Sequence, residues 1–164
     1  MRPFRIVLAC ALVAGLSACA PKPGGYTGPE VTRILVYKNE RPMYLMHRDE
    51  ILSAHRIALG FAPDGHKRFE GDGRTPVGQY VIDRRNPDSE FHLSLGISYP
   101  GPEDIAAARE AGKSPGGDIM IHGSSKSPAR RQGDWTWGCI AVTNEEIEQI
   151  YRMVKLGTVI DIYP

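Results

Sequence analysis

The sequence predicts a mainly β domain with short helices, the clearest of which lies close to the C-terminus. From residue 32 to residue 99, short runs of apolar and β-branched residues alternate with turns that contain Gly, Pro and Asn. Later, Ile147, Ile150, Tyr151 and Val154 recur at the i, i+3, i+4 and i+7 spacing of an amphipathic helix. The length of 164 residues leaves room for one domain of ordinary size.

The first half of the chain supplies most of the expected strands. Asn39–Pro42 separates two β-like runs, and this arrangement predicts a hairpin. A glycine-rich, charged stretch, Gly60–Gly78, interrupts the later runs. The expected strands are Arg33–Lys38, Met43–Met46, Ile51–Leu59, Gln79–Arg84 and Phe91–Tyr99.

Two segments carry helix signals. Pro102–Ala111 is rich in Ala, begins with Pro and stops before Gly112, which is the usual asymmetry of helix ends. Thr143–Glu146 has the capping-box pattern that opens a helix, and Gly157 is its expected end. A last strand is expected at Thr158–Ile162, directly after this helix.

The N-terminus has the pattern of an export signal. Two arginines precede an apolar run of 11 residues, Ile6–Leu16, whereas a membrane span needs about 20. Leu16–Cys19 (Leu-Ser-Ala-Cys) resembles the bacterial lipobox, in which the Cys is lipidated and becomes the new N-terminus. The alternative is an ordinary signal cut nearby, with Cys19 incidental. Residues 1–18 are thus expected to be a lipoprotein signal peptide, 19–31 a lipidated Cys19 with a flexible tether, and 32–164 the catalytic domain.

Composition and charge narrow the class of protein. Hydrophobic residues make up 41% of the chain and charged residues 24%, as in soluble globular domains. A formal net charge of +1 gives no basic footprint for nucleic acid. The expected location is the periplasm, with a lipid anchor in the outer membrane because Ala20 is not Asp. Loss of Cys10 and acylation of Cys19 would leave Cys139 as the one free thiol, and a lone thiol in an oxidising compartment needs a use.

Two short runs bring a thiol and an imidazole together. In Asp118–His122, alternation puts Ile119 and Ile121 on one face and His122 on the other. In Cys139–Val142 the same rule buries the two β-branched residues and turns Cys139 outward. Adjacent strands would then place His122 and Cys139 within hydrogen-bond reach, as nucleophilic catalysis requires. Gly138 lets main-chain N–H groups point at a developing oxyanion.

The surrounding residues resemble a known family. His122-Gly123-Ser124 is followed, after thirteen residues between His122 and Thr136, by Thr136-Trp-Gly-Cys-Ile140. This resembles the catalytic motif of the L,D-transpeptidase (YkuD) family, a His and then Ser/Thr-His-Gly-Cys. Gly71–Gly78, with its Thr-Pro-Val-Gly end, and the Gly116–Gly117 pair are similar to further segments of that family. The resemblance covers about residues 32–163 and implies a β-sandwich with one helix after the catalytic Cys.

The resemblance implies a peptidoglycan L,D-transpeptidase-type cysteine acyltransferase. Cys139 matches the nucleophile that attacks the carbonyl of the third stem-peptide residue, and an acyl-enzyme forms as the fourth residue leaves. His122 matches the general base, and the Gly123 carbonyl matches the group that orients its ring. The N–H groups of Gly138 and Cys139 match the oxyanion hole. The implied partners are peptidoglycan stem peptides and a peptidoglycan-linked lipoprotein, and no cofactor is needed.

Trp137 departs from the family pattern, because it replaces the usual second His, as in a subgroup related to enzymes that hydrolyse rather than cross-link. The acyl acceptor therefore stays open between an amine and water. One alternative is an L,D-specific hydrolase or amidase that releases stem residues or a linked lipoprotein. Another is an inactive wall-binding lipoprotein.

Several further residues are candidates for substrate binding. Trp135 and Trp137 either form an aromatic wall for the stem peptide or pack over their loop. Arg130 and Arg131 suit substrate carboxylates. His92 is a pocket-lining or structural residue. No metal site is expected, because His122 and Cys139 supply only two ligands and no further cluster accompanies them. His47, His55 and His66 are expected on the surface.

Overall fold

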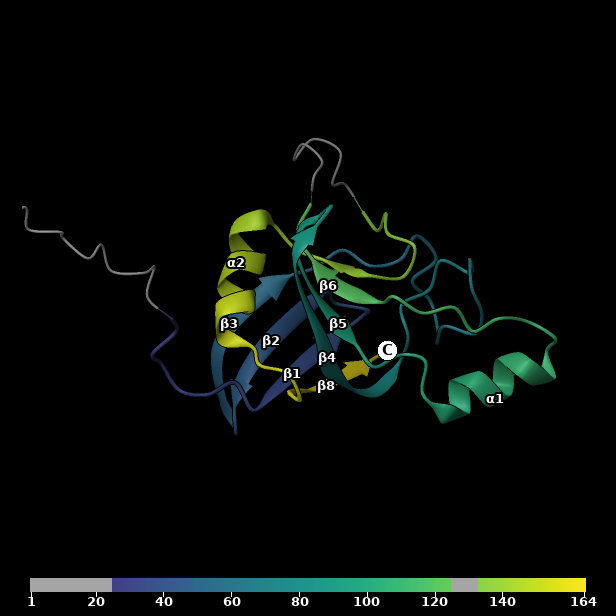
Figure 1. Ribbon diagram of the computed structural model, residues 1–164, viewed down its shortest axis with the longest axis horizontal. Coiled ribbons are helices and arrows are strands. Elements are labelled where there is room, and N and C mark those ends of the chain that lie inside the picture. Colours follow the sequence, from purple (N-terminus) through teal and green to yellow (C-terminus); the bar gives the residue numbers. More distant parts are fainter. Residues whose placement is uncertain (1–24, 125–132) are drawn as a thin grey trace, which may run out of the picture.

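A computed structural model describes residues 25–124 and 133–164 of the chain. In this part of the chain, eight strands and two short helices follow one another, with both helices late in the order (Figure 1). The elements are β1 (Arg33–Tyr37), β2 (Pro42–His47), β3 (Glu50–Arg56), β4 (Gly78–Ser89), β5 (His92–Ile97), α1 (Pro102–Glu110), β6 (Met120–His122), β7 (Ile140–Ala141), α2 (Asn144–Met153) and β8 (Val159–Tyr163). The expected fold class, mainly β with short helices, is confirmed.

The strands form one eight-stranded sheet in the order β3-β2-β1-β8-β4-β5-β6-β7. β4 is the longest strand and joins the two halves, because its first residues pair with β8 and its later residues with β5. A register shift between Ile82 and Arg84 marks a bulge at the junction. Such a bulge bends a strand and increases its twist.

A segment beyond β3 links the two edges of this sheet. Ala58 exchanges two backbone hydrogen bonds with Ala141 of β7, at 2.9 and 2.8 Å. Three residues later, the Phe61 N–H donates to the Thr136 carbonyl at 2.9 Å, next to a bridge between Gly60 and Thr136. The turn before Cys139 is therefore held by the chain that leaves β3.

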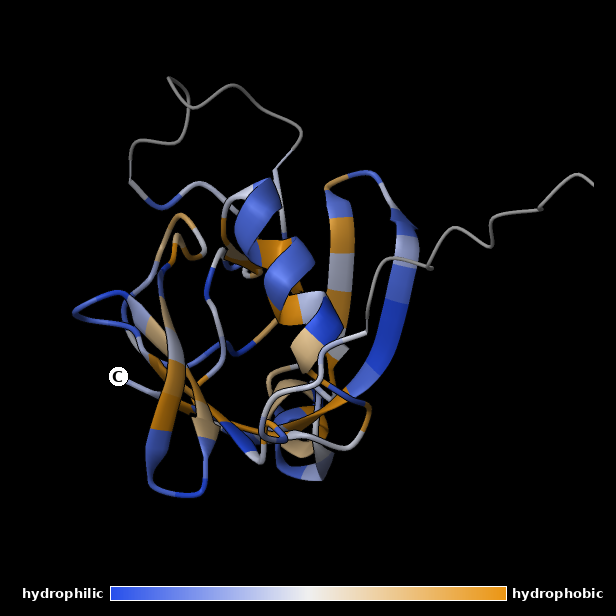
Figure 2. Cartoon of the chain, turned by 90° about the vertical axis from the view of Figure 1, so that its left-hand side faces the viewer, coloured by the Kyte–Doolittle hydropathy of each residue, from blue (hydrophilic) through white to orange (hydrophobic). Residues whose placement is uncertain are grey.

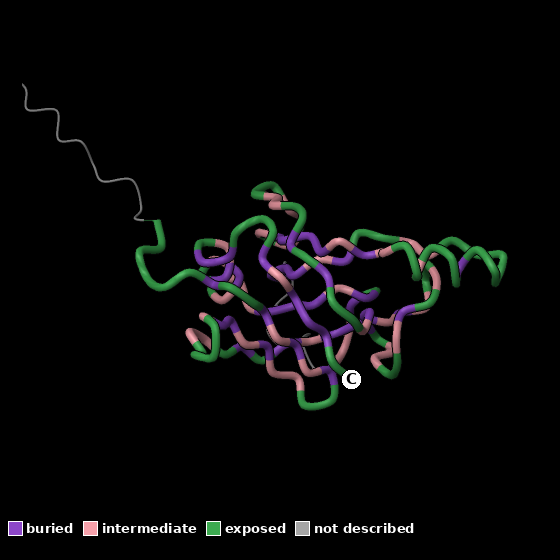
Figure 3. Tube along the Cα trace, turned by 90° about the horizontal axis from the view of Figure 1, so that it is seen from below, coloured by how far each residue is buried: buried purple, intermediate pink, exposed green. Residues whose placement is uncertain are grey.

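The core lies between the two halves of the sheet and the inner face of α2. Ile147 and Ile150 of α2 are completely buried. Leu95 of β5 and Ile121 of β6, on the strands beneath the helix, are also completely buried. Figure 2 shows α2 with hydrophobic residues turned to the strands and hydrophilic residues turned outward. Figure 3 shows the same separation by burial: buried residues follow the central strands, while α1 at the periphery buries only Ala108.

Most expected elements form, although the ends of several differ from the expected ones. The hairpin is confirmed, since β1 and β2 pair antiparallel. The expected strand Ile51–Leu59 ends at Arg56, because the next residues cross to β7. β4 continues to Ser89 through polar, solvent-facing residues that lack an apolar alternation but pair with β5. The strand expected to begin at Phe91 begins at His92 and ends at Ile97.

The late helix begins with the expected capping box and ends early. The Thr143 hydroxyl accepts the Glu146 N–H at 3.1 Å, and the Glu146 carboxylate accepts the Thr143 N–H at 2.8 Å. The helix stops at Met153 rather than at Gly157, because Val154 is extended and buried. The Arg85 guanidinium caps this end by donating to the Tyr151 and Val154 carbonyls.

His55 was expected on the surface, but it is buried, with 5% of its surface exposed. Its ring bonds to Ser53 Oγ at 3.0 Å and lies 3.4 Å from Glu146 Oε1, so it ties β3 to the start of α2. Within residues 25–124 and 133–164, no helix has the length and hydropathy to cross a membrane. The expected signal peptide and Cys19 lie outside the described residues.

Candidate active site

His122 and Cys139 lie on two adjacent parallel strands. β6 and β7 pair so that Ile121 faces Ile140 and His122 faces Ala141. Cys139 directly precedes β7, two residues before Ala141, so the thiol is diagonal to the imidazole across this pair. Ile121 and Ile140 are fully buried, which confirms the expected core face, and the thiol and imidazole belong to the opposite face.

The His122 ring is held in one tautomer. Its Nδ1 lies 2.5 Å from the Gly123 carbonyl oxygen, and a carbonyl can only accept, so Nδ1 carries the proton. Nε2 of a neutral ring is then left as the proton acceptor. Burial lowers the pKa of the His122 imidazole, although the Gly123 hydrogen bond opposes this shift. The ring is therefore a neutral base near pH 7.

The Cys139 thiol is protonated at rest. Burial is the largest influence and raises the pKa of the thiol; backbone contact with Met120 and the Lys67 charge oppose it, while the Asp118 carboxylate adds to it. Sγ donates to the Asp118 carbonyl at 3.4 Å. Among the described residues it makes no hydrogen bond to His122 at rest.

The turn before the thiol depends on a glycine. Gly138 has φ +127°, a conformation that side chains rarely adopt, and a Cβ there would lie 2.6 Å from the Arg74 carbonyl oxygen. Its N–H donates to Thr136 Oγ1 at 3.2 Å, and the same hydroxyl donates to the Cys139 carbonyl at 2.7 Å. The expected oxyanion donor at Gly138 is therefore bonded within its own turn at rest.

An aromatic enclosure surrounds the imidazole, although His122 was expected on an outward face. Phe91 packs on the His122 ring with centroids 4.5 Å apart, and Trp135 meets it edge-on at 5.9 Å. His122 is consequently 3% exposed. Phe91 is a site residue that the sequence did not reveal, because it lies in the turn between β4 and β5, far from the motif in the chain.

The two tryptophans have different surroundings. Trp135 packs against Phe91 and His122, whereas Trp137 is 71% exposed. Trp137 meets Phe61 edge-on with centroids 5.0 Å apart, and Phe61 is itself exposed. Trp137 thus forms part of an open aromatic surface beside Cys139.

Of the other expected substrate-binding residues, His92 lies apart from the aromatic enclosure of His122. His92 is exposed, and its Nε2 lies 2.8 Å from Glu148 Oε1 of α2, so it turns toward the helix rather than the imidazole. Arg130 and Arg131 lie outside the described residues. Among the residues that are described, no group of three or more His, Cys, Asp or Glu side chains is arranged to hold a metal ion.

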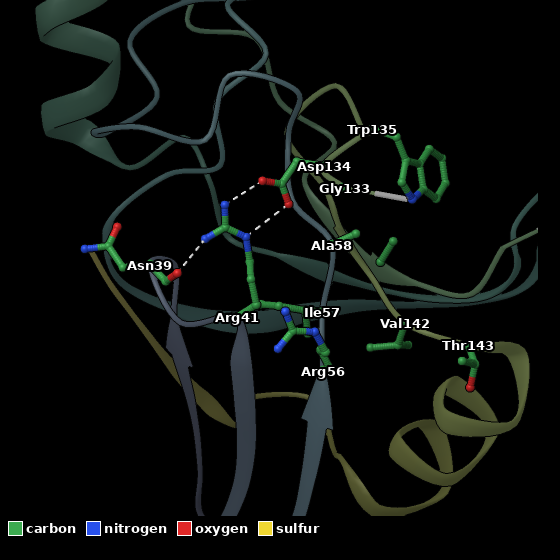
Figure 4. Close-up of a pocket in the computed structure, with 11 residues that line it drawn as sticks. Asn39, Arg41, Arg56, Ile57, Ala58, Gly133, Asp134, Trp135, Val142 and Thr143 are labelled. Carbon is green, nitrogen blue, oxygen red and sulfur yellow. Dashed lines mark hydrogen bonds and ion pairs between the residues drawn. The ribbon is translucent and has the colours of Figure 1, made fainter. Parts of the chain in front are cut away.

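A cavity of about 490 Å³ adjoins Trp135. Figure 4 shows its floor, where the Arg41 guanidinium turns toward the Asp134 carboxylate. The two groups bond through Nε to Oδ1 at 3.1 Å and through Nη2 to Oδ2 at 2.5 Å. Asp134 Oδ1 also accepts the Leu59 N–H at 2.8 Å. This ion pair anchors the chain that leads to Trp135 and Cys139.

A charged loop supports the other side of the thiol. The buried Asp72 carboxylate accepts hydrogen bonds from Lys67 Nζ at 2.9 Å and from the backbone N–H groups of Arg68 and Arg74 at 2.7 and 3.0 Å. Arg74 in turn faces Gly138 through its carbonyl. The glycine-rich stretch is therefore a folded support of the Cys139 turn rather than a phosphate-binding loop.

The fold and the site define a class of protein. A family profile for the L,D-transpeptidase catalytic domain (YkuD) matches residues 31–162, so the chain belongs to that family. The YafK protein of Escherichia coli K12 is 29% identical over 127 residues, which cover 74% of this chain and 46% of YafK.

Solved structures agree with this assignment. The helical cell shape determining protein Pgp2 of Campylobacter jejuni is 28% identical with a TM-score of 0.63, and the match covers 84% of this chain and 49% of Pgp2. Bd1075 of Bdellovibrio bacteriovorus is 26% identical with a TM-score of 0.60, covering 82% and 48% of the two chains. The chain thus spans about half the length of these relatives. An L,D-transpeptidase from Mycobacterium smegmatis, 13% identical with a TM-score of 0.57 over 82% of this chain and 59% of its own, shares the fold.

Proposed function

We propose that this chain is a peptidoglycan L,D-transpeptidase-type cysteine acyltransferase with Cys139 as its nucleophile. The observation that carries the proposal is the pairing of a thiol with a neutral, single-tautomer imidazole on one face of two adjacent strands. Family membership supports the substrate class, the stem peptides of peptidoglycan. Whole-protein partners are left open, since the relatives are about twice as long.

The first half-reaction starts from two neutral groups. As Sγ attacks the carbonyl carbon of the third stem residue, its proton passes to His122 Nε2, and the S–C bond forms. The tetrahedral intermediate then collapses, the C–N bond breaks, and the imidazolium returns the proton to the leaving amine. A thioester remains on Cys139. Because the thiol is bonded to the Asp118 carbonyl at rest, it must turn from that acceptor toward the imidazole before it reacts.

The turn before Cys139 supplies the oxyanion donors in this proposal. The Cys139 N–H makes no backbone hydrogen bond to any described residue, so it is available to the developing oxyanion. The Gly138 N–H would exchange its bond to Thr136 Oγ1 for the oxyanion. The Thr136 hydroxyl keeps its bond to the Cys139 carbonyl and so holds the peptide unit in place.

Hydrolysis is the second candidate, and Trp137 is the observation that favours it. An indole N–H can only donate, so Trp137 cannot take a proton from an incoming amine as a second His could. The His122 imidazole can deprotonate a water molecule without the help of a second base. Attack of that water on the thioester would release a shortened stem or a peptidoglycan-linked lipoprotein. The third reading is a wall-binding lipoprotein without turnover.

Product analysis with matched variants tests these readings. Purified protein is incubated with tetrapeptide muropeptides, and intact mass and products are measured. We expect an acyl adduct on the wild type, none on Cys139→Ala, and at least a hundredfold slower turnover in His122→Gln. His47→Gln, a change at a half-buried His of β2 whose ring bonds to the Glu30 carbonyl, should leave the rate unchanged.

Each product identifies one reading. Dimers linked between two third residues indicate transfer, and shortened monomers indicate hydrolysis. Product formation by Cys139→Ala would overturn the nucleophile assignment. A wild type that binds sacculi but forms neither adduct nor product would support the binding reading instead.

The proposed location is the periplasmic side of the outer membrane, with a lipid anchor on Cys19. The lipobox-like residues ahead of Cys19 support this proposal. Cys19→Ala should move the protein from the membrane fraction to the soluble fraction. Unchanged fractionation of that variant would argue against the anchor.

A further inference from the structure

We propose that Arg84, whose side chain crosses β5 over Gly96, forms a carboxylate-binding subsite for the acyl donor beside Cys139. The ligand class is a free carboxylate of the stem peptide close to the bond that is cleaved. The inference rests on the proposed function, because it concerns the substrate of the same site.

A β-bulge turns Arg84 to the face of the nucleophile. Ile82 is completely buried, and Arg84 lies two residues later, so regular alternation would point both into the core. The register instead pairs Ile82 with Ile97 and Arg84 with Gly96, which leaves Asp83 as the extra residue. Bulges often re-aim a side chain next to an active site. The Arg85 side chain consequently points to the inner face of the sheet, where it caps the C-terminal end of α2.

The strand register aligns Arg84 with the thiol. Arg84 pairs with Gly96, and Gly96 pairs with Met120. The pairing of Ile121 with Ile140 places Met120 level with Cys139 on the next strand. Cross-strand neighbours in one row point to one face of a sheet. Arg84, Met120 and Cys139 therefore lie on the same face of the sheet. Figure 1 shows β4, β5 and β6 side by side.

Gly96 provides the path for the Arg84 side chain. A Cβ at Gly96 would lie 3.0 Å from both Cβ and Nε of Arg84 and 2.9 Å from Asp83 Oδ1. The guanidinium can cross β5 only because this side chain is missing. It reaches the next strand, where Nη2 lies 3.7 Å from Met120 Sδ. The guanidinium therefore lies against the side chain of Met120, the residue level with Cys139 on the neighbouring strand.

Asp118 fixes the guanidinium at this place. Arg84 Nη2 donates a hydrogen bond to Asp118 Oδ1 at 2.9 Å. The backbone carbonyl of the same Asp118 accepts a hydrogen bond from the Cys139 thiol at 3.4 Å. The two side chains are 48% and 82% exposed, so the ion pair adds little to stability. A positioning role for the cation accounts for it better than a structural one.

The guanidinium keeps donors for a ligand. Only Nη2 has a hydrogen-bond partner among residues 25–124 and 133–164, which leaves Nη1 without one. Arg85, by contrast, uses both Nη atoms on carbonyls of α2 and stacks on the Tyr151 ring at 3.8 Å. The free Nη1 group can donate a charge-assisted hydrogen bond to a carboxylate oxygen.

Two carboxylates of a stem peptide could occupy this subsite. One is the side-chain carboxylate of a diamino dicarboxylic acid at the third position, and the other is the terminal carboxylate of the fourth residue. Both are close to the carbonyl that Cys139 attacks. Substrates in which one or the other is converted to an amide distinguish these two sources.

The experiment compares acid and amide substrates on matched variants. Steady-state turnover is measured with a free tetrapeptide stem, with its third-residue amide and with its terminal amide. For the wild type, amidation of the recognised carboxylate should raise KM at least tenfold. Arg84→Gln should raise KM for the free acid by a similar factor, with kcat within about twofold of the wild type. In this variant, KM for that amide should equal KM for the free acid.

Two other variants separate recognition from structural damage. Gly96→Ala should displace the Arg84 side chain and reproduce the loss of selectivity between acid and amide. Arg84→Lys, which keeps the charge but not the planar fork, should restore part of it. Arg152→Gln, at an exposed arginine whose nearest carboxylate is 4.0 Å away on α2, should behave as the wild type.

The outcomes distinguish the inference from the proposed function. Equal KM values for the acid and both amides in an active wild type would overturn the Arg84 subsite and leave the function standing. Retained selectivity in Arg84→Gln would do the same. A wild type with no Cys139 adduct and no turnover of any substrate would overturn both.

Discussion

Asp134 holds the segment that leads to the nucleophile, and its removal should be costly. Its carboxylate is 14% exposed and accepts three hydrogen bonds, two from Arg41 and one from the Leu59 N–H. The Leu59 carbonyl in turn accepts the N–H groups of Trp135 and Thr136 at 3.1 and 3.0 Å. Asp134→Ala therefore loosens the ion pair and the backbone pairing next to it.

The expected destabilisation is about 3 kcal/mol. Leaving a buried backbone N–H such as that of Leu59 without a partner costs about 1–3 kcal/mol. Losing a charged bidentate partner adds about 1–2 kcal/mol, reduced from the fully buried figure because Arg41 is 21% exposed. For a domain of this size, such a loss lowers the melting temperature by roughly 6–12 °C.

Urea unfolding with a matched variant measures this loss. Asp134→Asn retains an oxygen for the Leu59 N–H but removes the charge, so it should lose only about half as much free energy of unfolding as Asp134→Ala. Combining each change with Arg41→Met gives the coupling between the two side chains. A loss below about 1 kcal/mol for Asp134→Ala, or equal losses for both variants, would refute the reasoning.

Three further predictions concern titrating groups. Asp118→Asn removes a charge that raises the pKa of Cys139, so the pH profile of thiol alkylation should move to lower pH; an unmoved profile contradicts this. Phe91→Ala lets water reach His122, whose pKa burial lowers, so the acidic limb of turnover should move to higher pH, and a shift the other way would be inconsistent. Burial lowers the pKa of Lys38 to about 8 from 10.5. The unfolded chain thus binds more protons between these values, and wild-type stability relative to Lys38→Met should rise with pH from 8 to 10.5 by up to about 3 kcal/mol in urea titrations. A constant difference would exclude this linkage.

The strand pattern and the motif were predictable because each depends on residues close in the chain. Alternation around Ile121 and Ile140 predicted the buried face of the two strands, and this is confirmed. The capping box at Thr143 was equally local. The end of α2 was not, because the Arg85 guanidinium that caps it comes from β4.

Alternation predicts the face on which His122 and Cys139 lie, but it does not predict their register. The pairing of His122 with Ala141 offsets the thiol by two residues. Phe91 escaped prediction for a similar reason, since a hairpin turn distant in sequence brings it onto the imidazole. The bulge that re-aims Arg84 also has no local signal, because it exists only as a mismatch between two strands.

Local periodicity and motif spacing were enough to predict the fold class, the family and the candidate thiol and imidazole. The tertiary structure decided which groups meet: the Phe91 and Trp135 enclosure of His122, the Asp118 acceptor of the thiol, and the path of Arg84 over Gly96. These depend on strand register and on a glycine with no side chain. Both act between segments that are far apart in the chain, where no local pattern can record them.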